Sequence, residues 1–94
     1  MTDIYFITNG KNIKIGRSKN IEERIVSLQT GNDVELKLLY TIPNMPEYFE
    51  KHIHIICDRY NIKGEWFSLD ALNHLLNHPW FKDNMKKIDK KILI

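Results

Sequence analysis

Four side chains of kinds that bind or act on phosphate occur in the first part of the 94-residue chain: Tyr5, Lys14, Arg24 and Glu50. Lysine and arginine pair with phosphate oxygens, and a lone carboxylate can share a Mg²⁺ ion with substrate phosphate. Each of the four stands in a segment with a regular pattern of apolar residues, so strands and helices should hold them in fixed places. Two cations and a carboxylate on a small scaffold therefore suggest phosphate chemistry.

Each of these residues also has an ordinary structural interpretation. A tyrosine on a strand usually packs, and an arginine beside an apolar stripe usually lies over it with its head in water. Glu50 could pair with His54 one helical turn later. Only the placement of all of them around one point would favour a site over these interpretations.

The segment that carries Tyr5 and Lys14 reads as a β-hairpin. Residues 4–8 and 13–15 are rich in β-branched and aromatic residues, and the Asn-Gly pair between them favours a tight turn. The hairpin should place Tyr5 and Lys14 across from one another. A helix should follow with Arg24 at the edge of its apolar face, where the guanidinium could aim at a phosphate.

The second half should add one strand and two helices. Residues 35–42 alternate and then turn apolar, which predicts a third strand. A helix is expected from Pro46 to about Tyr60, with Glu50 at the border of its buried face. A short extended piece over 65–67 and a further helix should come before the lysine-rich end of the chain.

This order of elements predicts an α+β fold. A small three-stranded antiparallel sheet should be flanked by helices, in a β-β-α-β-α order completed by a short extra strand and a C-terminal helix. One domain should span residues 1–81, and residues 82–94 should form a basic C-terminal tail that could be helical.

The charge distribution is uneven although the net charge is only +2. Residues 1–24 hold five Lys or Arg and residues 82–94 hold five Lys, whereas residues 25–81 have four cations and seven anions. Clustered cations attract phosphate backbones, but charge alone favours an ordinary solvated surface.

The composition indicates a reducing compartment and no membrane partner. Cys57 is a single cysteine within an apolar helical pattern, which predicts a buried thiol instead of a disulfide or a zinc site. No apolar run approaches the roughly 18 residues of a membrane span, and the first residues do not resemble a secretion signal. We therefore expect an intracellular protein, in the cytoplasm of a cell or of an infected host.

Several short motifs occur in a fixed order along residues 3–68. They are Ile4-Tyr5, Lys14-Ile15-Gly16, Arg24 eight residues later, Leu28-Gln29-Thr30-Gly31, Glu50 with His54, and Gly64-Glu65-Trp66-Phe67. Each motif alone is weak. The set in this order resembles the GIY-YIG nuclease superfamily, and within it a compact subgroup of phage, bacterial and viral proteins.

The resemblance implies a metal-dependent endonuclease that hydrolyses nucleic-acid phosphodiester bonds, with DNA as the expected substrate and Mg²⁺ or Mn²⁺ as the cofactor. By analogy, Glu50 would hold the metal ion, Arg24 would stabilise charge on the scissile phosphate, and Tyr5 would position or deprotonate the attacking water. His54 would orient a phosphate or the metal's water shell, or else have a structural role beside Glu50. Further contacts to nucleic acid are expected from Lys11, Arg17 and Lys19.

Two positions depart from the family pattern, since Asp3 stands where the family name has glycine and Lys14 stands where better-studied members have tyrosine. A lysine ammonium cannot act as a base unless burial strongly lowers its pKa. Lys14 is therefore expected to hold the phosphate or steer the leaving group. The general base is then either Tyr5 or a metal-bound hydroxide. Glu65 is expected to have a structural role, with a second metal contact as the alternative.

Two other functions fit the same residues. The chain could be a catalytically weak or inactive nucleic-acid-binding module on the same fold, which the lysine at position 14 favours. It could also act in protein interaction, with its apolar end Ile92-Leu93-Ile94 mediating homodimerisation or docking.

Overall fold

A computed structural model describes residues 1–91, which form an α+β fold around a six-stranded antiparallel sheet in the order β4-β5-β2-β1-β3-β6. The strands are β1 (Thr2–Thr8), β2 (Asn12–Ser18), β3 (Lys37–Met45), β4 (Asn61–Lys63), β5 (Trp66–Ser68) and β6 (Lys86–Lys91). The helical elements are α1 (Ile21–Thr30), α2 (Phe49–Ile56), the 3-10 turn η1 (Asp58–Tyr60), α3 (Asp70–Leu76) and α4 (Pro79–Asn84).

The prediction of three strands was wrong because the sheet extends at both edges. The expected strands correspond to β1, β2 and β3, and β5 is the short extra strand. β4 pairs with β5, and β6 pairs with β3 in the segment expected to be a tail. A lysine-rich strand suits an edge, because charge there discourages pairing with other chains. The domain boundary expected at residue 82 falls inside α4, and the apolar end at 92–94 lies outside the described residues.

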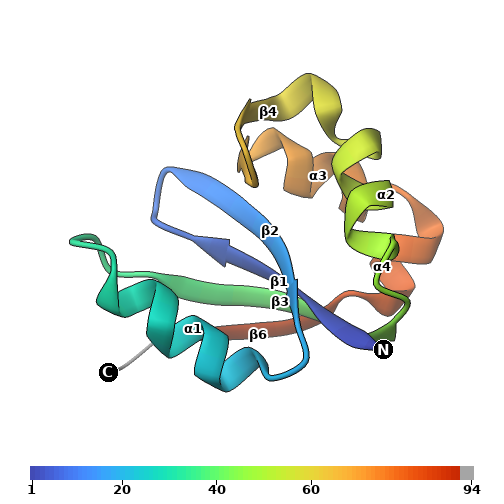
Figure 1. Cartoon of the computed structure of the whole chain (residues 1–94). Helices are drawn as coiled ribbons and strands as arrows, with labels where there is room; N and C mark the ends of the chain where they lie inside the picture. Colours follow the sequence, from blue (N-terminus) through green and yellow to red (C-terminus); the bar gives the residue numbers. More distant parts are fainter. Residues whose placement is uncertain (92–94) are drawn as a thin grey trace.

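The sheet has a core on each face, and strand alternation assigns side chains to them. Ile4 and Phe6 of β1 belong to the larger core, and Tyr5 and Ile7 belong to the smaller one. Helices α2, α3 and α4 lie on the first face and α1 lies on the second (Figure 1). Buried residues thus alternate between two layers along one central strand.

The hairpin register differs from the expected one by two residues. Tyr5 lies opposite Gly16, and Lys14 lies opposite Ile7. The turn is held by Asn9, whose Oδ1 accepts hydrogen bonds from the two backbone N–H groups that follow Gly10, at 3.0 and 2.8 Å. Because the difference is an even number of residues, Tyr5 and Lys14 still project from the same face of the sheet.

Helices α1 and α2 hold Arg24 and Glu50 on opposite faces of the sheet. Asn20 caps α1, since its Oδ1 accepts a hydrogen bond from the N–H of Glu23 at 3.1 Å, and Arg24 follows in the first turns. Helix α2 is shorter than predicted, because it begins at Phe49, ends at Ile56 and gives way to η1. Glu50 nevertheless remains in its first turn.

The thiol of Cys57 is buried at the end of α2, as expected. Burial raises its pKa to about 11, so the thiol stays protonated and unreactive near neutral pH. Within residues 1–91, no helix is both long and apolar enough to cross a membrane.

Candidate functional site

The candidate site forms where Gly16 lies against the ring of Tyr5 on the α1 face of the sheet. Tyr5 is only 1% exposed, and it reaches across Gly16 toward the outer side of β2. A Cβ atom on Gly16 would lie 2.9 Å from Tyr5 Cε1 and closer still to Cζ and the hydroxyl oxygen. The missing side chain at position 16 therefore lets the tyrosine hydroxyl reach the strand edge.

Replacing Gly16 with alanine is expected to displace the Tyr5 ring and to destabilise the fold by about 1–3 kcal/mol, as overpacking does in other cores. Urea unfolding of the variant measures the effect. Gly31→Ala is the matched control, because Gly31 has φ −87 and its nearest neighbour to an added Cβ lies at 3.8 Å. Equal stability of the two variants would contradict the packing described for Tyr5.

Strand β5 pairs with only part of β2, and beyond its end a side chain of α2 hydrogen-bonds to the free edge of β2 next to Gly16. Pairing with β5 covers Asn12 to Lys14, and the N–H of Ile15 then donates to the carbonyl of Glu65 at 3.0 Å. His54 of α2 takes the next position, where its Nε2–H donates to the Ile15 carbonyl at 2.8 Å. His54 thus anchors α2 to the sheet edge.

Tyr5 and Arg24 form a pair on the α1 face. Arg24 lies on the exposed side of α1, and its guanidinium is within hydrogen-bonding reach of the Tyr5 hydroxyl. Burial raises the pKa of Tyr5, helped by the negative charge of Glu65, while the hydrogen bond from Arg24 opposes the rise. The hydroxyl is therefore protonated near neutral pH. Because arginine only donates, the Tyr5 oxygen accepts and its O–H remains available.

Glu50 reaches the same strand edge from the other face. Its side chain is 17% exposed, and one oxygen lies 4.0 Å from Arg17 Nε. Burial is the main cause that raises the pKa of Glu50, and the charge of Glu65 adds to it. The neighbouring side chains of His54, Arg17 and Lys14 lower the pKa of Glu50 and so act in the opposite direction.

Lys14 is tied to residues of the β4–β5 hairpin. Its Nζ lies 3.3 Å from the carboxylate of Glu65 and 5.5 Å from the centre of the Trp66 ring. This ion pair places Glu65 next to the site, where its charge acts on Tyr5, Arg24 and Glu50. Glu65 thus connects the residues of both faces electrostatically.

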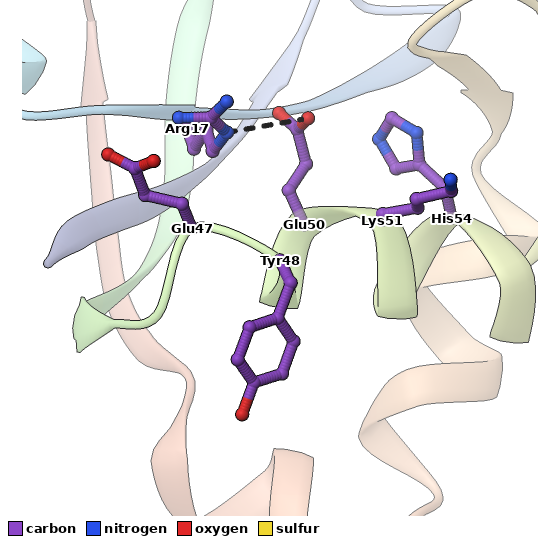
Figure 2. A pocket seen from close by; sticks show the side chains of 6 residues that line it. All are labelled: Arg17, Glu47, Tyr48, Glu50, Lys51 and His54. Carbon is purple, nitrogen blue, oxygen red and sulfur yellow. Dashed lines mark ion pairs between the residues drawn. The ribbon is translucent and has the colours of Figure 1, made fainter.

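An open pocket of about 440 Å³ lies beside the first turn of α2. It is lined by Arg17, Glu47, Tyr48, Glu50, Lys51 and His54. Figure 2 shows Arg17 and Glu50 facing one another at the pocket, while the ring of Tyr48 points away from them. A second hollow of about 360 Å³ includes Lys19 and Arg24 on the α1 side.

The structure brings most of the predicted residues to one end of β2, but not all of them. Arg17 lines the pocket, and Lys19 lies near it in an exposed ion pair with Glu47 at 3.9 Å. Lys11 sits in the hairpin turn at the other end of β2. Six residue steps along the extended chain separate Lys11 from Arg17, roughly 20 Å at the usual rise per residue. Lys11 therefore does not belong to this group.

Three residues of the pocket were not singled out from the sequence, namely Glu47, Tyr48 and Lys51. All three lie within three residues of Glu50 along the chain, so their position beside a candidate catalytic carboxylate was the signal that could have identified them. The central position of Glu65 depends on long-range pairing of β5 with β2, for which the sequence offered only a motif.

The donor set around Glu50 suits a metal ion that keeps most of its waters. Among residues 1–91 no group of three or more His, Cys, Asp and Glu side chains gathers, which does not favour an all-protein cage. Mg²⁺ commonly uses one or two carboxylates and completes its shell with water and substrate phosphate. Glu50, partly buried and electrostatically coupled to Glu65, fits that arrangement.

Comparison with known proteins identifies one family. The T5orf172 domain, which is found in phage and bacterial nuclease-like proteins, matches residues 3–92. The match covers both faces of the site and the β6 strand. No curated protein and no solved structure matches the chain.

Proposed function

Since the chain belongs to the T5orf172 domain family, we propose that it is a metal-dependent endonuclease of the GIY-YIG type that hydrolyses phosphodiester bonds in DNA. One observation supports this proposal above the others. The same edge of β2 at Gly16 is approached from both faces of the sheet. Tyr5 and Arg24 lie on one face, and Glu50 lies on the other. A phosphate at that edge could be contacted from both sides.

Arg24 and Tyr5 supply the hydrogen bonds of the proposed reaction. The guanidinium stabilises the charge that develops on the phosphoryl oxygens, and its planar fork suits two of them at once. Tyr5 is protonated near neutral pH, so its O–H orients the attacking water or a phosphate oxygen. The same protonation argues against Tyr5 as the group that removes the water's proton.

Glu50 is the residue proposed to hold the metal ion. A bound Mg²⁺ or Mn²⁺ would lower the pKa of a water and offset phosphate charge. Glu50 supplies a carboxylate whose nearest cation, Arg17, lies as far as 4.0 Å away, so the carboxylate is not fully compensated by the protein. His54 orients α2, and thereby Glu50, through its bond to the Ile15 carbonyl.

Strand β6 offers a further contact to nucleic acid on the α1 face. Thr41 pairs with Tyr5 on one side and with Lys86 on the other, so these side chains form one row across the sheet. Lys86 is exposed, and two strand spacings place its Cα roughly 10 Å from that of Tyr5. A strand of nucleic acid bound at Arg24 could extend to this lysine.

Lys86→Ala is expected to weaken DNA binding and to reduce the slope of log affinity against log salt by about one, because one phosphate contact is lost. Binding measured by fluorescence anisotropy over a salt series checks this. Lys87→Ala is the matched control, since Lys87 is exposed on the same strand but pairs with Tyr40, which faces the other core. Equal salt-dependence slopes for the two variants would show that nucleic acid bound at Arg24 does not extend to Lys86 on β6.

The proposal is tested by incubating the purified protein with circular DNA and either Mg²⁺, Mn²⁺ or a chelator. Nicking that requires a metal ion supports it. The alternative function is a binding module without hydrolysis, and the pairing of Lys14 with Glu65 favours that alternative because it occupies both charged groups. Salt-sensitive DNA binding with no cleavage under any of the three conditions would select the binding module.

A further inference from the structure

Tyr48 is a large aromatic residue that the fold leaves exposed beside the candidate site. Its relative exposure is 67%, and it lies at the N-cap of α2, two residues before Glu50. No side-chain hydrogen bond caps the helix from this position. Helix capping therefore gives no reason for a tyrosine at position 48.

A connected set of aromatic rings supports Tyr48 from beneath. The His52 ring meets Tyr48 edge to face at 6.2 Å between centroids, and Phe49 stacks on His52 at 6.5 Å. Phe49 in turn lies 5.3 Å from Trp80, which is 39% exposed. These contacts tie the exposed ring to the larger core through α2 and α4, so Tyr48 is backed by ordered structure.

The pocket beside Tyr48 is lined by two basic and two acidic side chains, so it suits a charged ligand better than an apolar protein surface. Arg17 and Lys51 line the same pocket, and both can reach a phosphate. The pocket's other residues besides Tyr48 are Glu47, Glu50 and His54, so its wall is almost entirely ionisable. A protein partner that anchored on Tyr48 would bury these charges, which is costly unless each finds an opposite charge.

We propose that Tyr48, with His52 beneath it, stacks an unpaired base of the nucleic-acid strand whose phosphate enters the pocket, so that the substrate is single-stranded or locally unpaired. This inference rests on the proposed function for the place of the scissile phosphate. Aromatic side chains bind bases of any sequence through their π-faces. Stacked bases inside a duplex do not offer a free face, so the contact selects unpaired positions.

Binding of labelled oligonucleotides in the presence of a chelator tests the inference separately from cleavage. Tyr48→Ala is expected to lower affinity for a single strand about 5- to 100-fold, the range seen for loss of one base–aromatic stack. Tyr48→Trp should keep the affinity. Ile55→Ala is the control, because Ile55 is 65% exposed on the same helix and should contribute nothing.

An abasic strand and a fully paired duplex complete the experiment. Tyr48→Ala should leave affinity for both of these ligands unchanged, because neither offers a free base. An equal loss of affinity for the abasic strand, or no difference between Tyr48→Ala and Ile55→Ala on the single strand, would overturn the inference; the latter result would leave a protein partner as the reason for the exposed ring. Base-dependent binding without any metal-dependent cleavage would instead keep the inference and reject the proposed nuclease.

Discussion

Glu50→Gln should remove metal-dependent cleavage, by more than the roughly 100-fold that loss of an outer-shell partner of a metal site can cost. Glutamine keeps the shape of the side chain and loses the negative charge, so the proposed ion would lose its protein ligand. Initial rates of plasmid nicking at saturating Mg²⁺ measure the effect. Cleavage at the parent rate would show that Glu50 is not the metal ligand.

Stability measurements can show that this loss does not arise from misfolding. The pKa of Glu50 is raised in the folded state, chiefly by burial, so ionising the carboxyl opposes folding. Below the ordinary pKa of 4.5, Glu50 is protonated in both the folded and the unfolded protein, so its burial has no electrostatic cost. Above the raised pKa of the folded state, the carboxylate is charged in both, and the full free-energy cost of burying its charge opposes folding. Glu50→Gln should therefore be more stable than the parent at neutral pH, and the gain should vanish in acid.

Glu47→Gln is the matched control for that stability experiment. Its side chain is 56% exposed on the same pocket, against 17% for Glu50, so removal of its charge should change the unfolding free energy little. A Glu50 variant that is less stable than the parent at neutral pH would contradict the electrostatics of the site. In that case an arginine or an unrecognised partner must compensate the carboxylate.

Arg24→Ala should lower the cleavage rate about 100- to 1000-fold, the usual cost of removing one preorganised donor from a transition state. Arg24→Lys should recover only part of the rate, because an ammonium keeps the charge but loses the bidentate fork. Single-turnover rates at saturating protein separate this effect from weaker binding.

Arg59→Ala is the control for Arg24, since Arg59 contacts the Tyr60 ring at 5.2 Å on η1 and contributes to neither pocket. A similar loss in both arginine variants would point to general charge effects. An unchanged single-turnover rate in Arg24→Ala would place charge stabilisation on another residue.

The centre of the fold could be predicted because local signals and long-range packing agree there. The Asn-Gly turn and the alternation in β1 and β2 fixed the hairpin, and Asn20 caps α1. The outer strands could not be predicted in the same way. β4 has only three residues, and β6 carries lysines in place of an alternating apolar pattern, so both depend on a neighbouring strand to form.

The residues of the candidate site could be predicted from local sequence, whereas their arrangement depends on long-range pairing of the strands. The residue types of Tyr5, Arg24 and Glu50 marked them as candidates, and the fold brings them to one strand edge. The sequence could not supply the register that sets Tyr5 on Gly16, because a hairpin pattern of this kind tolerates an even shift. The sequence also could not show that Lys14 forms an ion pair with Glu65, since that pairing depends on the position of β5.

A parallel time course of DNA nicking by the parent and by Glu50→Gln, each with Mg²⁺ and with a chelator, tests whether Glu50 belongs to a hydrolytic site. We expect nicking only by the parent with Mg²⁺, together with equal or greater stability of the variant at neutral pH. Metal-dependent nicking by the variant at the parent rate would contradict the claim that Glu50 and the Gly16 edge of β2 form a hydrolytic site.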